Sequence, residues 1–233
     1  ETSRQWLNQD GTLTAEICSG PLHYRAEDGS WRDIDTTLQA SLKDGYGYCV
    51  LDSPTRVYLS ATADGWQAVE VGDLLVEFRA EGTSRAPGIV DGNTITYPDA
   101  WPGVDLRYTV TPRGLKEDII LKRQPPRDGF TFVFKPCALS PVPGVDGSLV
   151  MQDSLSARSA RIAAPFLVDA RAKSSWSVDA SWESRADGSL EVRLVPDQAW
   201  LAKARYPVVL APPLSIENEQ HDVAVDKYFF DCA

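Results

Sequence analysis

The chain has 233 residues, with 23 Lys and Arg against 33 Asp and Glu, which gives a net charge of −10. Hydrophobic residues make up 43% of the sequence, enough to bury a sizeable core, and this composition argues against disorder. No apolar run approaches the length of a membrane-spanning helix, and the acidic balance argues against nucleic acid as a partner.

Alternating apolar and polar residues predict β-strands along the whole chain, most clearly at residues 13–17, 104–110, 176–182 and 190–194. Glycine follows aspartate at eight places between such stretches. This dipeptide favours tight type I′ turns, because both central residues of that turn need a positive φ. We therefore expect an all-β fold, an antiparallel β-sandwich built as one large unit or two packed sandwich-like units, with almost no helix.

Helical signals are nearly absent, and residues 196–204 allow two helical turns, with Asp197 near the start and Trp200 and Leu201 facing inward. Proline-rich stretches at 125–129 and 136–144 are the strongest breaks in the chain. They predict a first β-sandwich-like unit over residues 1–140, a second β unit over 141–213 and a strand-like tail over 214–233.

The four cysteines lie far apart and lack the close ligand pairs of a zinc site. We expect disulfides Cys18–Cys49 and Cys137–Cys232, since each would join segments predicted as strands. Two alternatives stay open: four buried thiols, or a bridge from Cys232 to a neighbouring subunit. The chain begins with Glu1 rather than Met, which fits both a mature secreted protein and a trimmed chain.

Side chains suited to catalysis are sparse. The chain has two histidines, His23 and His221, and no Gly-x-Ser-x-Gly motif. Glu117 and Asp118 are the carboxylates to consider for hydrolysis, but neighbouring residues of a strand point to opposite faces. Asp99 and Asp105 lie nearby in the sequence. We expect no catalytic residue, no metal and no cofactor.

Three tryptophans beside turns, Trp31, Trp66 and Trp101, could form a platform for sugars, although a place in the core is the more common role. The final segment alternates imperfectly. Its apolar residues are expected to dock into the chain's own sheet or into another subunit, and they are Val223, Val225, Tyr228 and Phe230.

Three stretches carry a family resemblance: SGPLHYRAEDGSWRDIDTTL at 19–38, YPDAWPGVDLRYTVTPRGLKEDIILK at 97–122 and VPDQAWLAKARYPVVL at 195–210. Together they resemble the amino-terminal module of large bacterial surface and secreted proteins, including wall-associated RHS-repeat proteins and proteins with DNRLRE-type β domains. The resemblance covers about residues 10–213 and implies an exported, β-rich, non-catalytic scaffold. The chain departs from the pattern at Ala211, where such modules have Asp, and at Cys18 and Cys49, where small or non-cysteine residues are expected.

These observations predict a non-enzymatic structural subunit of a bacterial extracellular assembly, a filament or surface layer. Its partners would be copies of itself, joined by addition of a β-strand to a neighbouring sheet. One alternative is a module that binds cell-wall or matrix polysaccharide. Another is a fragment of the shell of a secreted RHS-type toxin. Each hypothesis places the protein outside the cell or at its surface.

Overall fold

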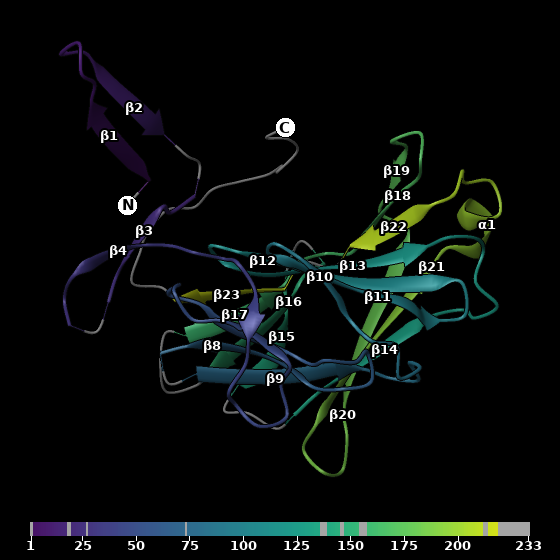
Figure 1. The fold of residues 1–233 in the computed structure, drawn as a ribbon. Helices are drawn as coiled ribbons and strands as arrows, with labels where there is room; N and C mark the ends of the chain where they lie inside the picture. Colours follow the sequence, from purple (N-terminus) through teal and green to yellow (C-terminus); the bar gives the residue numbers. More distant parts are fainter. Residues whose placement is uncertain are drawn as a thin grey trace.

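The computed structural model describes residues 2–17, 20–26, 28–72, 74–135, 139–144, 147–153, 158–211 and 214–218. Two large antiparallel sheets dominate these residues, and they pack face to face (Figure 1). The predicted all-β sandwich is therefore confirmed. Within the described ranges, no helix has the length and apolar character needed to cross a membrane.

The first sheet has eight strands. In spatial order they are β20 (Val178–Ser184), β21 (Leu190–Pro196), β14 (Phe130–Phe134), β9 (Leu74–Ala80), β8 (Gln67–Val71), β7 (Arg56–Leu59), β6 (Tyr48–Val50) and β5 (Gln39–Ala40).

The second sheet has eleven strands, eight of them in one continuous path. The path runs β10 (Ile89–Asp91), β11 (Thr94–Trp101), β12 (Val104–Thr111), β13 (Gly114–Leu121), β23 (Leu214–Asn218), β17 (Arg158–Ile162), β16 (Leu149–Asp153) and β15 (Leu139–Pro143). Off this path, β22 (Val208–Ala211) pairs with β13 and β18 (Phe166–Val168), and β19 (Ser174–Ser175) pairs with β18.

The core lies between these two sheets. All four apolar residues on one face of β12 are fully buried, as their alternation predicts: Val104, Leu106, Tyr108 and Val110. Phe78 of β9 meets the Tyr108 ring edge-on at 6.0 Å between ring centres, so aromatic side chains of the two sheets are in direct contact.

Two hairpins at the N-terminus form small sheets of their own: β1 (Ser3–Leu7) with β2 (Leu13–Ile17), and β3 (His23–Arg25) with β4 (Trp31–Asp33). The β1–β2 hairpin stands apart from the sandwich (Figure 1). Leu7 and Leu13 face each other across it, and each is about 70% exposed, at 73% and 69%. The predicted strand at residues 13–17 is therefore present, but Leu13 contributes nothing to the sandwich core.

The Asp-Gly turns differ from the predicted type I′ geometry. Glycines 11, 29 and 188 have φ near +82°, whereas the preceding aspartates do not have a positive φ. In the first hairpin the N–H of Asn8 donates to Thr12 O and that of Gly11 donates to Asn8 O. This pattern matches a three-residue turn that ends in a left-handed glycine.

A side-chain bond explains the preference for this turn. In three hairpins the aspartate carboxylate accepts both the hydroxyl and the backbone N–H of the Ser or Thr that follows glycine; the pairs are Asp10–Thr12, Asp28–Ser30 and Asp187–Ser189. The pKa of Asp28 is lowered to about 2, chiefly by the bond from the Ser30 hydroxyl, then by the Ser30 backbone N–H and by Arg32. The signal in the sequence is thus Asp-Gly-Ser/Thr rather than Asp-Gly alone.

The predicted helix is present as α1 (Gln198–Leu201). The Asp197 side chain caps it by accepting the N–H of Ala199, Leu201 is buried, and Trp200 packs against the core. It is the single helix among the described residues.

Both sheets combine strands from the two sides of the boundary predicted at residue 140. In the first sheet, β14 pairs with β21 over five residues. In the second, β13 pairs with β22 and β23. Whether residues 1–140 and 141–213 fold separately stays a prediction, although this pairing shows that each supplies strands to the other.

We expect a fragment of residues 1–140 to lack cooperative unfolding, because its β13 and β14 would each lose a paired neighbour and expose core residues to water. Mixing it with residues 141–233 should restore the transition. Urea titrations followed by tryptophan fluorescence would check this, with the full chain as the control. A separate, cooperative transition of the isolated 1–140 fragment would show instead that it is an independent domain.

Candidate functional site

Glu117 occupies a core-facing position on β13. It lies on the same face as Leu115, Ile119 and Leu121, which are all buried, and Glu117 itself is only 5% exposed. An acidic residue in this row is unusual, because a buried carboxylate loses the hydration that stabilises its charge. The predicted divergence of Glu117 and Asp118 is confirmed, because only Glu117 lines the interior cavity.

A cavity of about 20 Å³ adjoins Glu117 between the two sheets. Apolar side chains from four strands line the rest of it: Phe78, Phe132, Phe134, Ile162, Val192 and Leu194. The volume has room for a single water molecule. A sugar or a nucleotide does not fit, so the cavity cannot serve as a substrate pocket in this conformation.

Tyr108 lies directly opposite Glu117 on the neighbouring strand β12. Burial raises the pKa of Glu117 to about 8, and the adjacent Tyr108 hydroxyl and Asp118 modify this shift in opposite directions. Burial likewise raises the pKa of Tyr108 well above its ordinary value. The hydroxyl has no partner at hydrogen-bond geometry, so its interaction with Glu117 is a looser electrostatic contact. Glu117 is therefore protonated and uncharged at neutral pH.

Asp118 points to the opposite face of β13 and is also buried. Arg107 donates two bonds to one of its carboxylate oxygens, at 3.2 and 2.8 Å, and the Lys116 ammonium lies 3.4 Å from the other. Glu117 and Asp118 thus occupy two unrelated environments. They do not form the paired carboxylates of a glycoside hydrolase.

The structure does bring Asp99 and Asp105 together, at the turn between β11 and β12. The Lys122 ammonium lies 2.8 Å from a carboxylate oxygen of each. Asp105 also accepts the backbone N–H of Asp99, which has an unusual positive φ of 48°. The bond from Lys122 lowers the pKa of Asp99. These contacts hold a tight irregular corner, where the strand register shifts between Tyr97 and Trp101.

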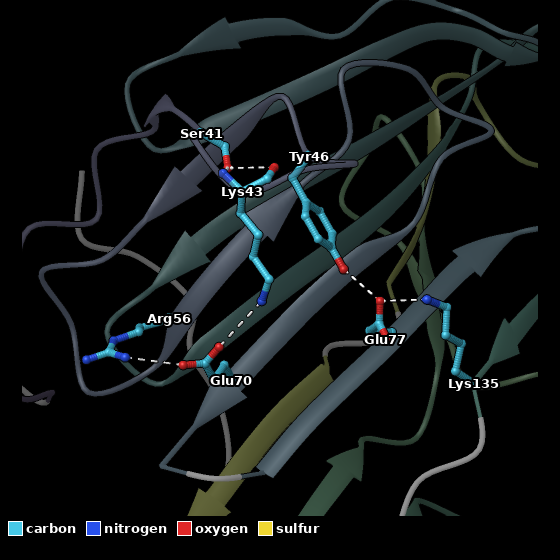
Figure 2. A network of polar contacts seen from close by, with 7 residues as sticks. All are labelled: Ser41, Lys43, Tyr46, Arg56, Glu70, Glu77 and Lys135. Atoms are coloured by element: carbon cyan, nitrogen blue, oxygen red, sulfur yellow. Dashed lines mark hydrogen bonds and ion pairs between the residues drawn. The ribbon is translucent and has the colours of Figure 1, made fainter.

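A network of charged and aromatic residues covers the outer face of the eight-stranded sheet. Figure 2 shows Glu70 between Lys43 and Arg56, with oxygen–nitrogen distances of 3.7 and 3.2 Å. Beside it, Glu77 accepts bonds from the Tyr46 hydroxyl at 2.8 Å and from the Lys135 ammonium at 2.7 Å.

This network fixes the loop at residues 41–47, which connects β5 and β6, onto the sheet. The Lys43 ammonium lies 4.1 Å from the centre of the Tyr58 ring, and the Tyr46 ring packs on Tyr58 at 5.5 Å. Burial opposes ionisation of Glu77, but the bonds from Lys135 and Tyr46 outweigh it and lower the pKa of Glu77. Sequence reasoning missed this cluster; its signal is the charged residues at outward positions of adjacent strands, such as Arg56, Glu70 and Glu77.

Cys49 lies beneath this loop as a free, buried thiol. Burial raises the pKa of its thiol. A free Cys49 does not support the predicted Cys18–Cys49 disulfide. Cys18, Cys137 and Cys232 lie outside the described residues, and so do His221 and the predicted assembly residues Val223, Val225, Tyr228 and Phe230.

The three tryptophans proposed as a sugar platform have three different environments. Trp101 is buried in the core, the environment expected as the more common one. Trp66 is half-buried, with Arg79 and Lys135 each 4.7 Å from its ring centre. Trp31 is 58% exposed on β4, contrary to the expectation of a core role. Binding of a polysaccharide stays a prediction that rests on Trp31 alone among the three.

His23 pairs with Asp33 across the β3–β4 hairpin, at 3.0 Å. This contact joins two neighbouring strands. Among the described residues, no Ser, Thr or Cys side chain has a hydrogen bond to His23 that would make it a nucleophile. Those residues also contain no group of three or more His, Cys, Asp or Glu arranged to hold a metal ion.

Similarity to known proteins extends along 98% of this chain. The chain is 25% identical to the tRNA(Glu)-specific nuclease WapA of Bacillus subtilis subsp. natto. It is 24% identical to the tRNA nuclease WapA of Bacillus subtilis strain 168 and to the tRNA3(Ser)-specific nuclease WapA of Bacillus spizizenii. The chain spans 11% of the length of each of these relatives. No family model and no solved structure matches the chain.

These relatives correct two predictions. The prediction that the protein is not an enzyme is wrong by this comparison, because the similar proteins are named as tRNA nucleases. The prediction of a filament subunit is not compatible with the similarity either, which favours the alternative of a toxin fragment. That expectation rested on the sparse catalytic side chains of this chain and on the non-catalytic scaffold that the family resemblance implies.

Protonation of Glu117 predicts a pH-dependent stability. The pKa of Glu117 in the folded protein, about 8, lies above its ordinary value of 4.5. Its protonation therefore contributes fully to the free energy of unfolding below pH 4.5, and this contribution is lost as the pH rises through 8. We expect the free energy of unfolding to fall by about 1 kcal/mol per pH unit between pH 5.5 and 8. Glu117→Gln should flatten this slope in urea titrations. The exposed control Glu183→Gln should keep it; equal slopes in wild type and Glu117→Gln would contradict the prediction.

The close approach of Gly47 to the sheet predicts a second effect. A Cβ at Gly47 would lie 2.8 Å from Ala61 Cβ and 2.9 Å from its backbone. Gly47→Ala should therefore displace the loop at residues 41–47 and cost about 1–3 kcal/mol. It should also speed labelling of Cys49 by a thiol reagent, measured by peptide mass. The control Gly20→Ala, with open space around the added methyl, should change neither; matching results for both variants would refute this role of Gly47.

Proposed function

We propose that this chain is a β-sandwich module of an exported nuclease toxin of the WapA type, and that it contributes to the shell of that protein. One observation carries the proposal: the similarity to the three WapA tRNA nucleases runs along 98% of this chain while it spans 11% of theirs. Cleavage of tRNA is the activity proposed for the full-length protein. The resemblance of residues 10–213 to wall-associated RHS-repeat proteins supports the same assignment and an extracellular location.

The structure supports a scaffolding contribution of the module. Its core is continuous across the two sheets and draws on residues from Leu38 to Leu210. Its charged outer face is largely neutralised by internal ion pairs, such as those of Glu70 and Glu77. A continuous core with an outer face held by ion pairs suits a shell element, which must hold its shape beside a reactive domain.

A chimera tests the proposal. The matching segment of the Bacillus subtilis strain 168 WapA would be replaced by this chain, and export and cleavage of total tRNA would be measured. We expect the chimera to retain both at near the level of the unmodified protein. A deletion of the segment should lose at least one of them, because the module supplies a folded part of the shell.

Two controls separate the possible causes of failure. A chimera carrying Gly47→Ala tests whether loss follows from destabilisation, since it should reduce the yield of exported protein but not tRNA cleavage per molecule. The second control is limited proteolysis of the chimera, which shows whether its module is folded. A folded chimera that loses export or tRNA cleavage as the deletion does would overturn the proposal.

A further inference from the structure

Five strands form the ends of the two large sheets, and four of them are poor templates for another strand. β5 and β19 have two residues each and β10 has three, while β15 contains Pro141 and Pro143. Short edges and prolines are common devices against unwanted strand pairing. β20 differs, since it has seven residues and no proline, and its far side has no neighbour among the described strands. It lies at the margin of the first sheet in Figure 1.

The backbone of β20 has hydrogen-bonding groups that point away from its sheet. The bonds Arg185 N–H to Ser189 O and Asp197 N–H to Ser177 O mark the two ends of its ladder with β21. Bonded and non-bonded pairs alternate in an antiparallel ladder. The register therefore directs the backbone groups of Asp179, Ser181 and Glu183 toward β21, and those of Ala180 and Trp182 toward the open edge.

The side chains of β20 present two distinct rows. Val178, Ala180 and Trp182 pack against the core, and the alternate row is exposed and consists of Asp179, Ser181 and Glu183. A strand that extends this sheet would continue the first row with apolar residues. Its second row would lie opposite the exposed acids.

The charges of the exposed row are uncompensated. Glu183 lies directly opposite Glu191 of β21, a pairing of like charges that destabilises a sheet. Arg185 binds Glu191 at 2.7 Å and also Glu81 at 3.0 Å, so its single charge is shared by these two acids. In the part of the chain that the structure describes, neither Asp179 nor Glu183 has an ion pair. A basic residue on an added strand would supply the missing charge.

We propose that β20 accepts an extended strand in which apolar and basic residues alternate, supplied by a polypeptide segment outside residues 1–233. Its main chain would bond to the free groups of Ala180 and Trp182, and its Arg or Lys residues would pair with Asp179 and Glu183. This inference concerns one sheet edge and is independent of the proposed nuclease function.

The same charges disfavour two other occupants. Two copies of β20 paired antiparallel about Ser181 would place acid opposite acid twice. Residues 219–233 are acidic as well, with four acids (Glu219, Asp222, Asp226, Asp231) against Lys227, so this tail is a poor match for the edge. Charge complementarity thus favours a foreign basic strand over self-association.

The test uses the full chain and a capped seven-residue peptide of alternating valine and arginine, with a valine–glutamate peptide as control. Isothermal titration should show binding of the arginine peptide only, weakened by added salt. Amide hydrogen exchange should show new protection at Ala180 and Trp182. No binding of the arginine peptide, or equal binding of both peptides, would overturn the proposal.

Two variants locate the interaction. The double variant Asp179→Asn/Glu183→Gln should bind the arginine peptide at least tenfold more weakly. Its midpoint of thermal unfolding should stay close to that of the wild type. Ala180→Pro removes one outward N–H without touching the β21 ladder and should abolish binding. The exposed control Asp44→Asn lies beside β5, at the opposite end of this sheet, and should bind as the wild type does. Undiminished binding by both edge variants, or dimerisation through β20 in sedimentation experiments, would refute the assignment.

Discussion

The sandwich depends on the return of the last third of the chain to strands formed in its middle. β13 and β14 follow each other in sequence but lie in different sheets, and each is paired on one side by strands from residues 190–218. Without those strands, both would leave backbone groups unpaired at the centre of the fold. The contact of Phe78 with Tyr108 joins the two sheets, so pairing within the sheets and packing between them are coupled.

That coupling explains how a carboxyl group can lie in the core. Glu117 sits where the two sheets meet, beside a cavity with room for one water molecule and against aromatic rings such as Phe134. A charged carboxylate there would lack solvation, whereas a protonated one behaves as a polar group of modest cost. Burial in this fold therefore favours the neutral, protonated form of Glu117.

The sequence predicted which residues share a face, but not what covers each face. The alternation in β12 and the cap at Asp197 are local signals, and both appear as expected. Leu13 carries the same kind of signal and is exposed, because alternation cannot tell whether a second sheet lies opposite. Turn type was missed for a different reason: the Ser or Thr after Asp-Gly adds a side-chain bond that the dipeptide alone does not reveal. Cys49 is a buried thiol that clusters with Tyr58 and Ala68, and Tyr46 of the loop at residues 41–47 packs against this cluster.

The stretches that carry the family resemblance encode corners of the fold rather than a reactive centre among the described residues. Gly103, with a φ of +77°, and the pair Asp99 and Asp105 shape the turn that links β11 and β12. Buried Asp169 accepts the backbone N–H of Arg205, which connects the third stretch to the end of β18. Corners of this kind fix where each strand ends and which edges stay open. Four edges of the two large sheets are short or contain proline, whereas β20 is guarded only by charge, so β20 is the edge of these two sheets where a neighbouring strand of the right charge can join.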